Sequence, residues 1–128
     1  MKRLAIFCRN GLRLMMLTLA ISGSVSAHHS FAMFDKTRFL EADGVVRKIE
    51  WSNPHVYLYL TAQHANKGEV QYSFEGSSPN ELNRWGWKIN SLKVGDQVKI
   101  GYFPLRDGRD GGLIFSVTLA NGRVLKAN

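Results

Sequence analysis

Alternation of apolar and polar residues is the strongest pattern in this chain and predicts β-strands from about residue 42 onward. The clearest example is residues 55–63, in which every second position is aliphatic: Val56, Leu58 and Leu60. Side chains alternate between the two faces of a strand, so these three residues share one face. That face is expected to line a hydrophobic core.

Further strands follow from the same alternation at residues 44–51, 69–75, 97–102 and 113–119. The tetrapeptide at residues 65–68, Ala-Asn-Lys-Gly, predicts a hairpin turn between the second and third strands. In the fifth strand one buried face is expected to carry Leu113, Phe115, Val117 and Leu119. Val124 and Leu125 predict a short terminal strand or tail.

One short helix is predicted after the third strand. Ser78 and Glu81 have the spacing of a capping box, and Pro79 suits the first helical position. Leu82 and Trp85 then form an apolar pair at i, i+3, before Gly86 ends the turn.

The order of these elements predicts an all-β fold with one short helix. Three strands, a helix and two more strands are the order of an OB-like five-stranded barrel, in which the helix closes one end. A split barrel or a small sandwich shares most of this pattern and stays open as an alternative.

Residues 1–27 are typical of a cleaved signal peptide. Their first half is basic and contains no acid, Leu14–Ile21 is apolar, and Val25-Ser26-Ala27 places small residues at the cleavage position. The apolar run is too short to cross a bilayer. We therefore expect an exported protein, periplasmic or secreted, whose mature chain begins at His28.

The mature chain is expected to contain an N-terminal arm and one domain. The arm, residues 28–41, has no regular period and is expected to lie over the domain through Phe31, Met33 and Phe34. Residues 42–128 form the OB-like β domain. This length is sufficient for one modest core.

Signal removal also changes the charge and the cysteine content. The precursor carries 17 basic and 10 acidic residues, and loss of the four basic residues in the signal lowers the net charge from +7 to +3. Such a balance does not favour nucleic acid as a partner, and no membrane partner is expected after cleavage. The single cysteine, Cys8, leaves with the signal, which excludes disulfides and thiolate metal sites from the mature protein.

Several blocks of the mature chain resemble a known group of proteins. These blocks are HHSFAMFD, GVVRKIEWSNPHVYLYL, EGSSPNELNRWGWK, LKVGDQVKIGYFPLRDG and GGLIFSVTLANGR. They resemble a family of small exported bacterial proteins catalogued as a domain of unknown function. The resemblance implies a location outside the cytoplasm and a compact β fold, and it implies no activity, cofactor or catalytic residue.

The mature terminus predicts a copper site. A terminal His28 offers its α-amine and ring Nδ1 to one metal ion, and His29 could instead bind Cu(II) as the second residue. Nitrogen donors in a tetragonal array suit Cu(II). His55, placed by Pro54 at a strand start, is the best third ligand, and His64 is the next. Ordinary surface histidines are the simpler alternative.

Aromatic residues predict a second kind of site, which needs no metal. Four of them lie on or near the second strand and the helix: Trp51, Tyr57, Tyr59 and Trp85. OB-type barrels bind ligands across their second and third strands, where aromatic rings stack on ligand rings. A saccharide, a peptide or a partner protein would fit such a face. Alternatively, the tryptophans only pack the barrel ends.

Catalysis has no support in the sequence. It lacks a G-x-S-x-G nucleophile elbow, and no acid–base pair can be named, so no catalytic residue is assigned. A copper-dependent enzyme is the weakest of the functional alternatives. The basic pairs Arg47 with Lys48 and Arg84 with Lys88 are interpreted as solvated surface charges. The expected role is a non-catalytic binding or accessory module for a small molecule or a protein.

Overall fold

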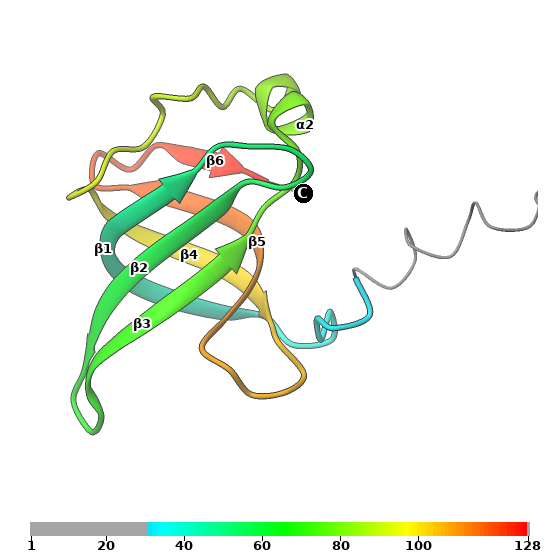
Figure 1. Ribbon diagram of the computed structural model, residues 1–128. Helices are drawn as coiled ribbons and strands as arrows, with labels where there is room; N and C mark the ends of the chain where they lie inside the picture. Colours follow the sequence, from blue (N-terminus) through cyan, green and yellow to red (C-terminus); the bar gives the residue numbers. More distant parts are fainter. Residues whose placement is uncertain (1–30, 128) are drawn as a thin grey trace, which may run out of the picture. The chain divides into compact units, whose positions relative to one another are not determined.

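Six strands and one short helix make up the part of the chain that the computed structural model describes, residues 31–127. Figure 1 shows α2 and β6 at one end of the barrel and the β2–β3 hairpin extending toward the other. The elements are β1 (Leu40–Glu50), β2 (Tyr57–His64), β3 (Gly68–Glu75), α2 (Pro79–Arg84), β4 (Gln97–Pro104), β5 (Gly111–Leu119) and β6 (Val124–Lys126). Within the described residues, no helix has the length and apolarity needed to span a membrane.

The first five strands close into a barrel. β1 is antiparallel to β4 through its first half and to β2 through its second, and Val45 pairs with both neighbours. β2 continues antiparallel into β3, and β4 into β5. A parallel pairing between β3 and β5 closes the ring, while β6 adds to the outer edge of β5. This closed order confirms the OB-like prediction over an open sandwich.

Two glycines allow β5 to lie close to both of its neighbouring strands at the point where the barrel closes. Gly111 lies opposite Ser73, and a Cβ at Gly111 would overlap the carbonyl oxygen of Ser73. A Cβ at Gly112 would overlap the carbonyl oxygen of Phe103 in the same way. β5 can therefore approach β3 and β4 this closely only without side chains at these two positions.

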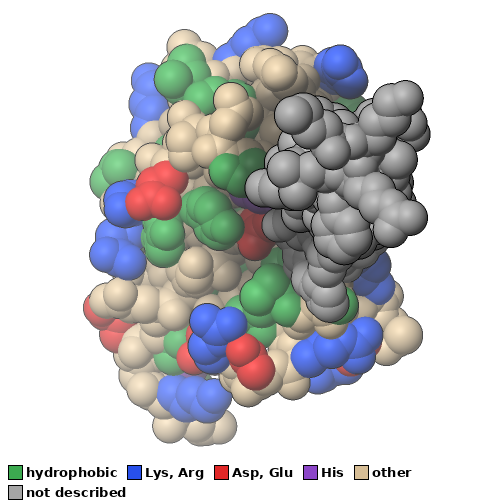
Figure 2. All heavy atoms as spheres, turned by 45° about the vertical axis from the view of Figure 1, so that its right-hand side comes forward, with side chains coloured by type: hydrophobic (Ala, Val, Ile, Leu, Met, Phe, Trp, Pro, Cys, Tyr) green, Lys and Arg blue, Asp and Glu red, His purple; other side chains and the backbone are tan. Residues whose placement is uncertain are grey.

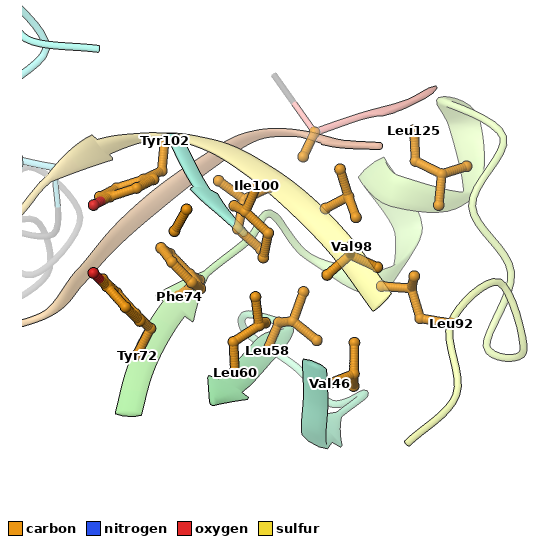
Figure 3. Close-up of a cluster of buried hydrophobic side chains, with 14 of the residues drawn as sticks. Val46, Leu58, Leu60, Tyr72, Phe74, Leu92, Val98, Ile100, Tyr102 and Leu125 are labelled. Carbon is orange, nitrogen blue, oxygen red and sulfur yellow. The ribbon is translucent and has the colours of Figure 1, made fainter. Parts of the chain in front are cut away.

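The core fills the barrel in layers (Figure 3). Tyr72 and Tyr102 lie at one end of it, and Leu92 and Leu125 lie at the other. At the aromatic end Phe74 stacks on Tyr72, with ring centroids 5.5 Å apart, and meets Tyr102 edge-on at 4.9 Å. Aliphatic side chains, among them Leu58, Leu60 and Ile100, lie between these ends.

The predictions for β2 and α2 are largely confirmed. Val56, Leu58 and Leu60 are all buried. The capping box is present, because Ser78 Oγ accepts from the Glu81 backbone N–H and the Glu81 carboxylate accepts from the Ser78 N–H. The predicted apolar pair does not form as a unit, since Leu82 is buried whereas Trp85 at the helix C-cap is 41% exposed.

The prediction for β5 is wrong for Phe115. Gly101 pairs with Ser116 but Tyr102 pairs with Ile114, so the register shifts and Phe115 falls in a bulge. Ile114 consequently takes the core position, and Phe115 is exposed beside Phe39, with ring centroids 5.6 Å apart.

β1 also begins at Leu40, four residues before the predicted start. Residues 40–44 pair with β4, and only Ala42 among them is buried, so their apolar alternation is weak. The segment before β1 is attached through Phe34, which is buried and bridges to Leu105. Phe31 and Met33, expected to share this role, are exposed.

Trp87 ties the segment after α2 to the C-terminal strand. Its indole is buried, and Nε1 donates to the carbonyl oxygen of Lys126 at 2.6 Å. Trp87→Phe is expected to lower the free energy of unfolding by about 1.5 kcal/mol more than Trp51→Phe does, because the Trp51 indole donates no hydrogen bond to a described residue. Urea unfolding followed by circular dichroism measures both. Equal losses would contradict a role for this hydrogen bond.

Candidate functional site

The connection between β1 and β2 sets the position of His55. Pro54 precedes it, in a cis peptide with Asn53. The Val56 N–H then donates to the Ser77 carbonyl oxygen at 3.1 Å, and the Gly76 N–H donates to the Val56 carbonyl oxygen at 2.7 Å. These two bonds hold the loop against the end of β3, so that His55 lies beside Glu75 and Gly76.

The His55 ring is oriented by two acceptors on the same nitrogen. Nδ1 lies 3.1 Å from the Gly76 carbonyl oxygen and 3.2 Å from Glu75 Oε1. The side chains of His55 and Glu75 are only 24% and 12% exposed. Because both neighbours accept, Nδ1 carries the proton, and in the neutral ring Nε2 is left with a lone pair. Nε2 has no hydrogen-bond partner among the described residues.

Glu75 also acts on Tyr57, the residue opposite it in the β2–β3 ladder. Burial raises the pKa of the Tyr57 hydroxyl, and the charge of Glu75 and its hydrogen bond with Tyr57 raise that pKa further. One carboxylate therefore links the imidazole of His55 to the phenol of Tyr57.

Glu75→Gln is expected to lower the pKa of Tyr57 toward the ordinary tyrosine value, because the negative charge that disfavours tyrosinate is removed while the burial remains. Near-ultraviolet absorbance during an alkaline titration measures this pKa, with Tyr57→Phe identifying its contribution. Ser73→Ala, which changes an uncharged neighbour, should leave the titration as it is. An unchanged pKa in Glu75→Gln would contradict the link.

The raised pKa of Tyr57 also makes its contribution to folding stability depend on pH. The folded state holds the Tyr57 proton more tightly than the unfolded chain does. Its contribution to stability is therefore complete below the unfolded pKa of about 10 and is lost as the pH rises through the folded value.

A pocket of about 290 Å³ lies next to this group. Its walls come from the segment before β1, from β2 and β3, and from the β4–β5 loop with the start of β5. It is lined by Met33, Phe34, Tyr57, Ser73, Glu75, Leu105, Arg109, Asp110 and Gly112. The lining combines apolar and aromatic side chains with two carboxylates and a guanidinium, a mixture typical of ligand pockets.

A wider groove of about 610 Å³ lies elsewhere, where β1 bends between β2 and β4. Its charged groups neutralise one another, since Lys99 Nζ lies 4.0 Å from Asp43 Oδ2 and 3.8 Å from Glu41 Oε2. It contains none of the candidate residues, and so we place the candidate site at the smaller pocket.

The four candidate aromatic residues are not brought together. Tyr57 lines the pocket, Trp51 packs half-buried against the core, and Trp85 is exposed at the helix C-cap. The Tyr59 hydroxyl donates to Glu50 at 3.2 Å, and Lys48 Nζ lies 5.3 Å from its ring centroid. Among the described residues, no ring contact joins any two of the four.

The candidate metal ligands differ in how far the structure describes them. His28 and His29 lie outside the described residues. His64 lies at the opposite end of β2 from the pocket, and its Nε2 lies 2.7 Å from the Tyr72 hydroxyl. Residues 31–127 contain no group of three or more histidine, cysteine or acidic side chains that could hold a metal ion. A metal at His55 would therefore need ligands from beyond this range.

A family model described as a family of unknown function, DUF6152, matches residues 16–116. This confirms the resemblance seen in the sequence blocks. No curated protein matches the chain.

Proposed function

The chain belongs to DUF6152, a family of unknown function, and we propose that the protein is an exported binding module that holds a copper ion. In this proposal Cu(II) is bound by the α-amine and Nδ1 of His28 and by Nε2 of His55. Three nitrogen donors in a tetragonal arrangement suit Cu(II), which leads the affinity order of divalent metals. The amine has a reference pKa of about 7.7 to 8.0, so losing its proton near neutrality costs little.

The orientation of His55 carries the proposal. Histidines that bind metals almost always donate their other ring N–H to a carboxylate or a backbone carbonyl. His55 has both kinds of acceptor at Nδ1, in Glu75 and Gly76. The negative charge of Glu75 also favours a dication bound nearby.

Chain length is compatible with this ligand set. His28 precedes Met33 by five residues, which span at most about 17 Å when fully extended. Met33 lines the same pocket as Glu75, the residue in contact with His55. Five residues of chain are therefore available to carry the His28 amine from Met33 toward the ring.

Export and cleavage are part of the proposal, because the amine of His28 is free only after removal of residues 1–27. We expect protein recovered from the periplasm of an expressing bacterium to have the mass of residues 28–128. Intact mass spectrometry measures this directly. Recovery of the full chain, or of a chain cut elsewhere, would mean that His28 has no free amine and would contradict the proposed terminal chelate.

A Cu(II) competition titration tests the metal site. The mature protein is expected to bind one equivalent, and His55→Ala is expected to weaken that binding roughly 100-fold or more, since even loss of a residue that only supports a ligand costs 10- to 100-fold. His64→Ala is the matched control and should bind as the parent does. Equal copper affinity in the parent and in His55→Ala would mean that only the N-terminal residues bind the ion, and would contradict a site that includes His55.

The pocket favours a second candidate function, binding of a saccharide, peptide or partner protein without metal. Tyr57 offers an aromatic face there beside Glu75, Asp110 and Arg109, and rings flanked by hydrogen-bonding groups suit such ligands. A glycan and peptide array probed with mature protein tests this. Binding that is lost in Tyr57→Ala but indifferent to an extra N-terminal residue would favour this candidate over copper.

A further inference from the structure

Residues 83–94, the end of α2 and the loop that follows it, combine buried anchors with exposed apolar side chains. Leu82, Trp87 and Leu92 are buried and fix this loop across one end of the barrel. Trp85 and Ile89, between these anchors, and Val94, just after them, are exposed by 41%, 70% and 69%. Exposed large apolar side chains on an otherwise well-packed loop are typical of interaction surfaces.

Backbone hydrogen bonds hold this loop in a defined shape. The Trp87 N–H donates to the Leu82 carbonyl oxygen at 2.9 Å, and the Gly95 N–H donates to the Val46 carbonyl oxygen at 2.8 Å. In the middle of the loop the Lys88 N–H donates to Ser91 Oγ at 2.7 Å. The exposed side chains are therefore presented from a fixed backbone, and ordering them on a partner costs little further entropy.

The same loop carries only positive charge. Arg84, Lys88 and Lys93 are all exposed, and residues 83–94 include no acid. None of the three forms an ion pair within residues 31–127. Figure 2 shows basic and apolar side chains at the top of the molecule, the end at which α2 lies in Figure 1, while acidic side chains in that view lie lower down.

The two nearest acids do not neutralise this charge directly. Glu81 and Asp96 flank the loop, and each carboxylate accepts a backbone N–H: Glu81 from Ser78 at 3.4 Å and Asp96 from Lys93 at 2.8 Å. The charged ends of the Arg84, Lys88 and Lys93 side chains remain available for an anionic partner.

We propose that residues 83–94 bind the surface of an anionic phospholipid bilayer. Basic side chains beside an anionic membrane are attracted to its headgroups, while tryptophan and aliphatic side chains enter the boundary between headgroups and acyl chains. Each exposed apolar residue directly follows a basic one along the loop: Trp85 follows Arg84, Ile89 follows Lys88 and Val94 follows Lys93. Single side chains spaced among charges suit insertion between lipid headgroups better than they suit a dry protein interface.

This proposal departs from two sequence-based expectations: that Arg84 and Lys88 are only solvated charges, and that the mature protein has no membrane partner. The exposure of Trp85 between these two basic residues supports an amphipathic role for the loop instead. The proposal does not depend on copper.

Vesicle co-sedimentation tests the proposal with two vesicle types: equal parts of phosphatidylglycerol and phosphatidylcholine, and phosphatidylcholine alone. The mature protein should bind the mixed vesicles and release them as salt increases. Lys88→Gln/Lys93→Gln is expected to weaken this binding about 25-fold, since each lysine beside an anionic surface contributes about fivefold. The matched control, Lys67→Gln/Arg38→Gln, removes the same charge from exposed positions in the β2–β3 turn and in the segment before β1, and should change it little.

The apolar contribution is tested by Ile89→Ser/Val94→Ser, which should weaken vesicle binding about tenfold because two aliphatic side chains are withdrawn from the lipid. Phe115→Ser, at the exposed bulge on β5, is the control. The proposal is overturned by equal binding to both vesicle types, or by equal loss in the two charge variants. Binding that the serine changes do not weaken would mean general attraction to polyanions, which also overturns it.

Discussion

Gly111→Ala is expected to lower the free energy of unfolding by about 4 kcal/mol or more, because it prevents the barrel from closing. Gly111 has a φ of +139°, a conformation that residues with a side chain rarely adopt. Its added Cβ would overlap the Ser73 carbonyl oxygen, which belongs to the backbone and cannot rotate away. Urea unfolding followed by circular dichroism measures the loss.

Gly108→Ala is the matched control for this substitution. Gly108 has a φ of +79° in the same loop, but a Cβ there would meet nothing within 4 Å. Gly108→Ala should lower the free energy of unfolding only by the backbone strain of a side chain at positive φ, about 1 to 2 kcal/mol. Similar losses in the two variants would show that positive φ alone accounts for both and that β3 and β5 can separate without penalty.

Acetylation of the His28 amine is expected to weaken Cu(II) binding by the mature protein roughly 100-fold. The acetyl group removes the amine lone pair, so that the amine and the His28 ring can no longer chelate one ion. The remaining imidazoles bind more weakly without that chelate. A competition titration of mature protein with and without the N-terminal acetyl group measures the change.

Amidation of the C-terminal carboxylate of Asn128 is the control for this comparison and should leave copper affinity unchanged. If N-terminal acetylation also leaves it unchanged, the amine is not a ligand and the terminal site is wrong. A saccharide or peptide site at the pocket would respond to neither modification.

Much of the fold follows from local sequence patterns. The alternation around Leu58 and Leu60 fixes which face of β2 is buried, and the capping box at Ser78 and Glu81 sets the start of the helix. Because each of these signals is contained in a few consecutive residues, tertiary contacts do not override them. The order of the elements then selects the OB-like closure.

Other features depend on contacts between distant residues and carry no local signal. The bulge at Phe115 arises from the register that β4 and β5 adopt, so the apparent alternation of Leu113, Phe115 and Val117 gives the wrong face for the middle residue. Trp85 fits a helical apolar stripe, but α2 ends at Arg84 and leaves it at the C-cap. In both cases the pattern is present but the element that would bury it is interrupted.

Part of the candidate site was within reach of the sequence. The hairpin turn at residues 65–68 is predicted, and in the structure His64 pairs with Gly68 and Tyr57 with Glu75. Following the β2–β3 pairing from this turn to the other end of β2 places Glu75 opposite Tyr57, two residues from His55. The contribution of Met33 and Asp110 to the pocket could not be predicted in this way, because their segments approach it only in the folded barrel.

The most direct test of the copper proposal is the electron paramagnetic resonance spectrum of mature protein with one equivalent of Cu(II), compared with His55→Ala. The proposal predicts coupling of the copper electron to three nitrogen ligands in the parent, with the nitrogen from His55 lost in the variant and both signals from His28 retained. Identical spectra for the two proteins would contradict a site that includes His55.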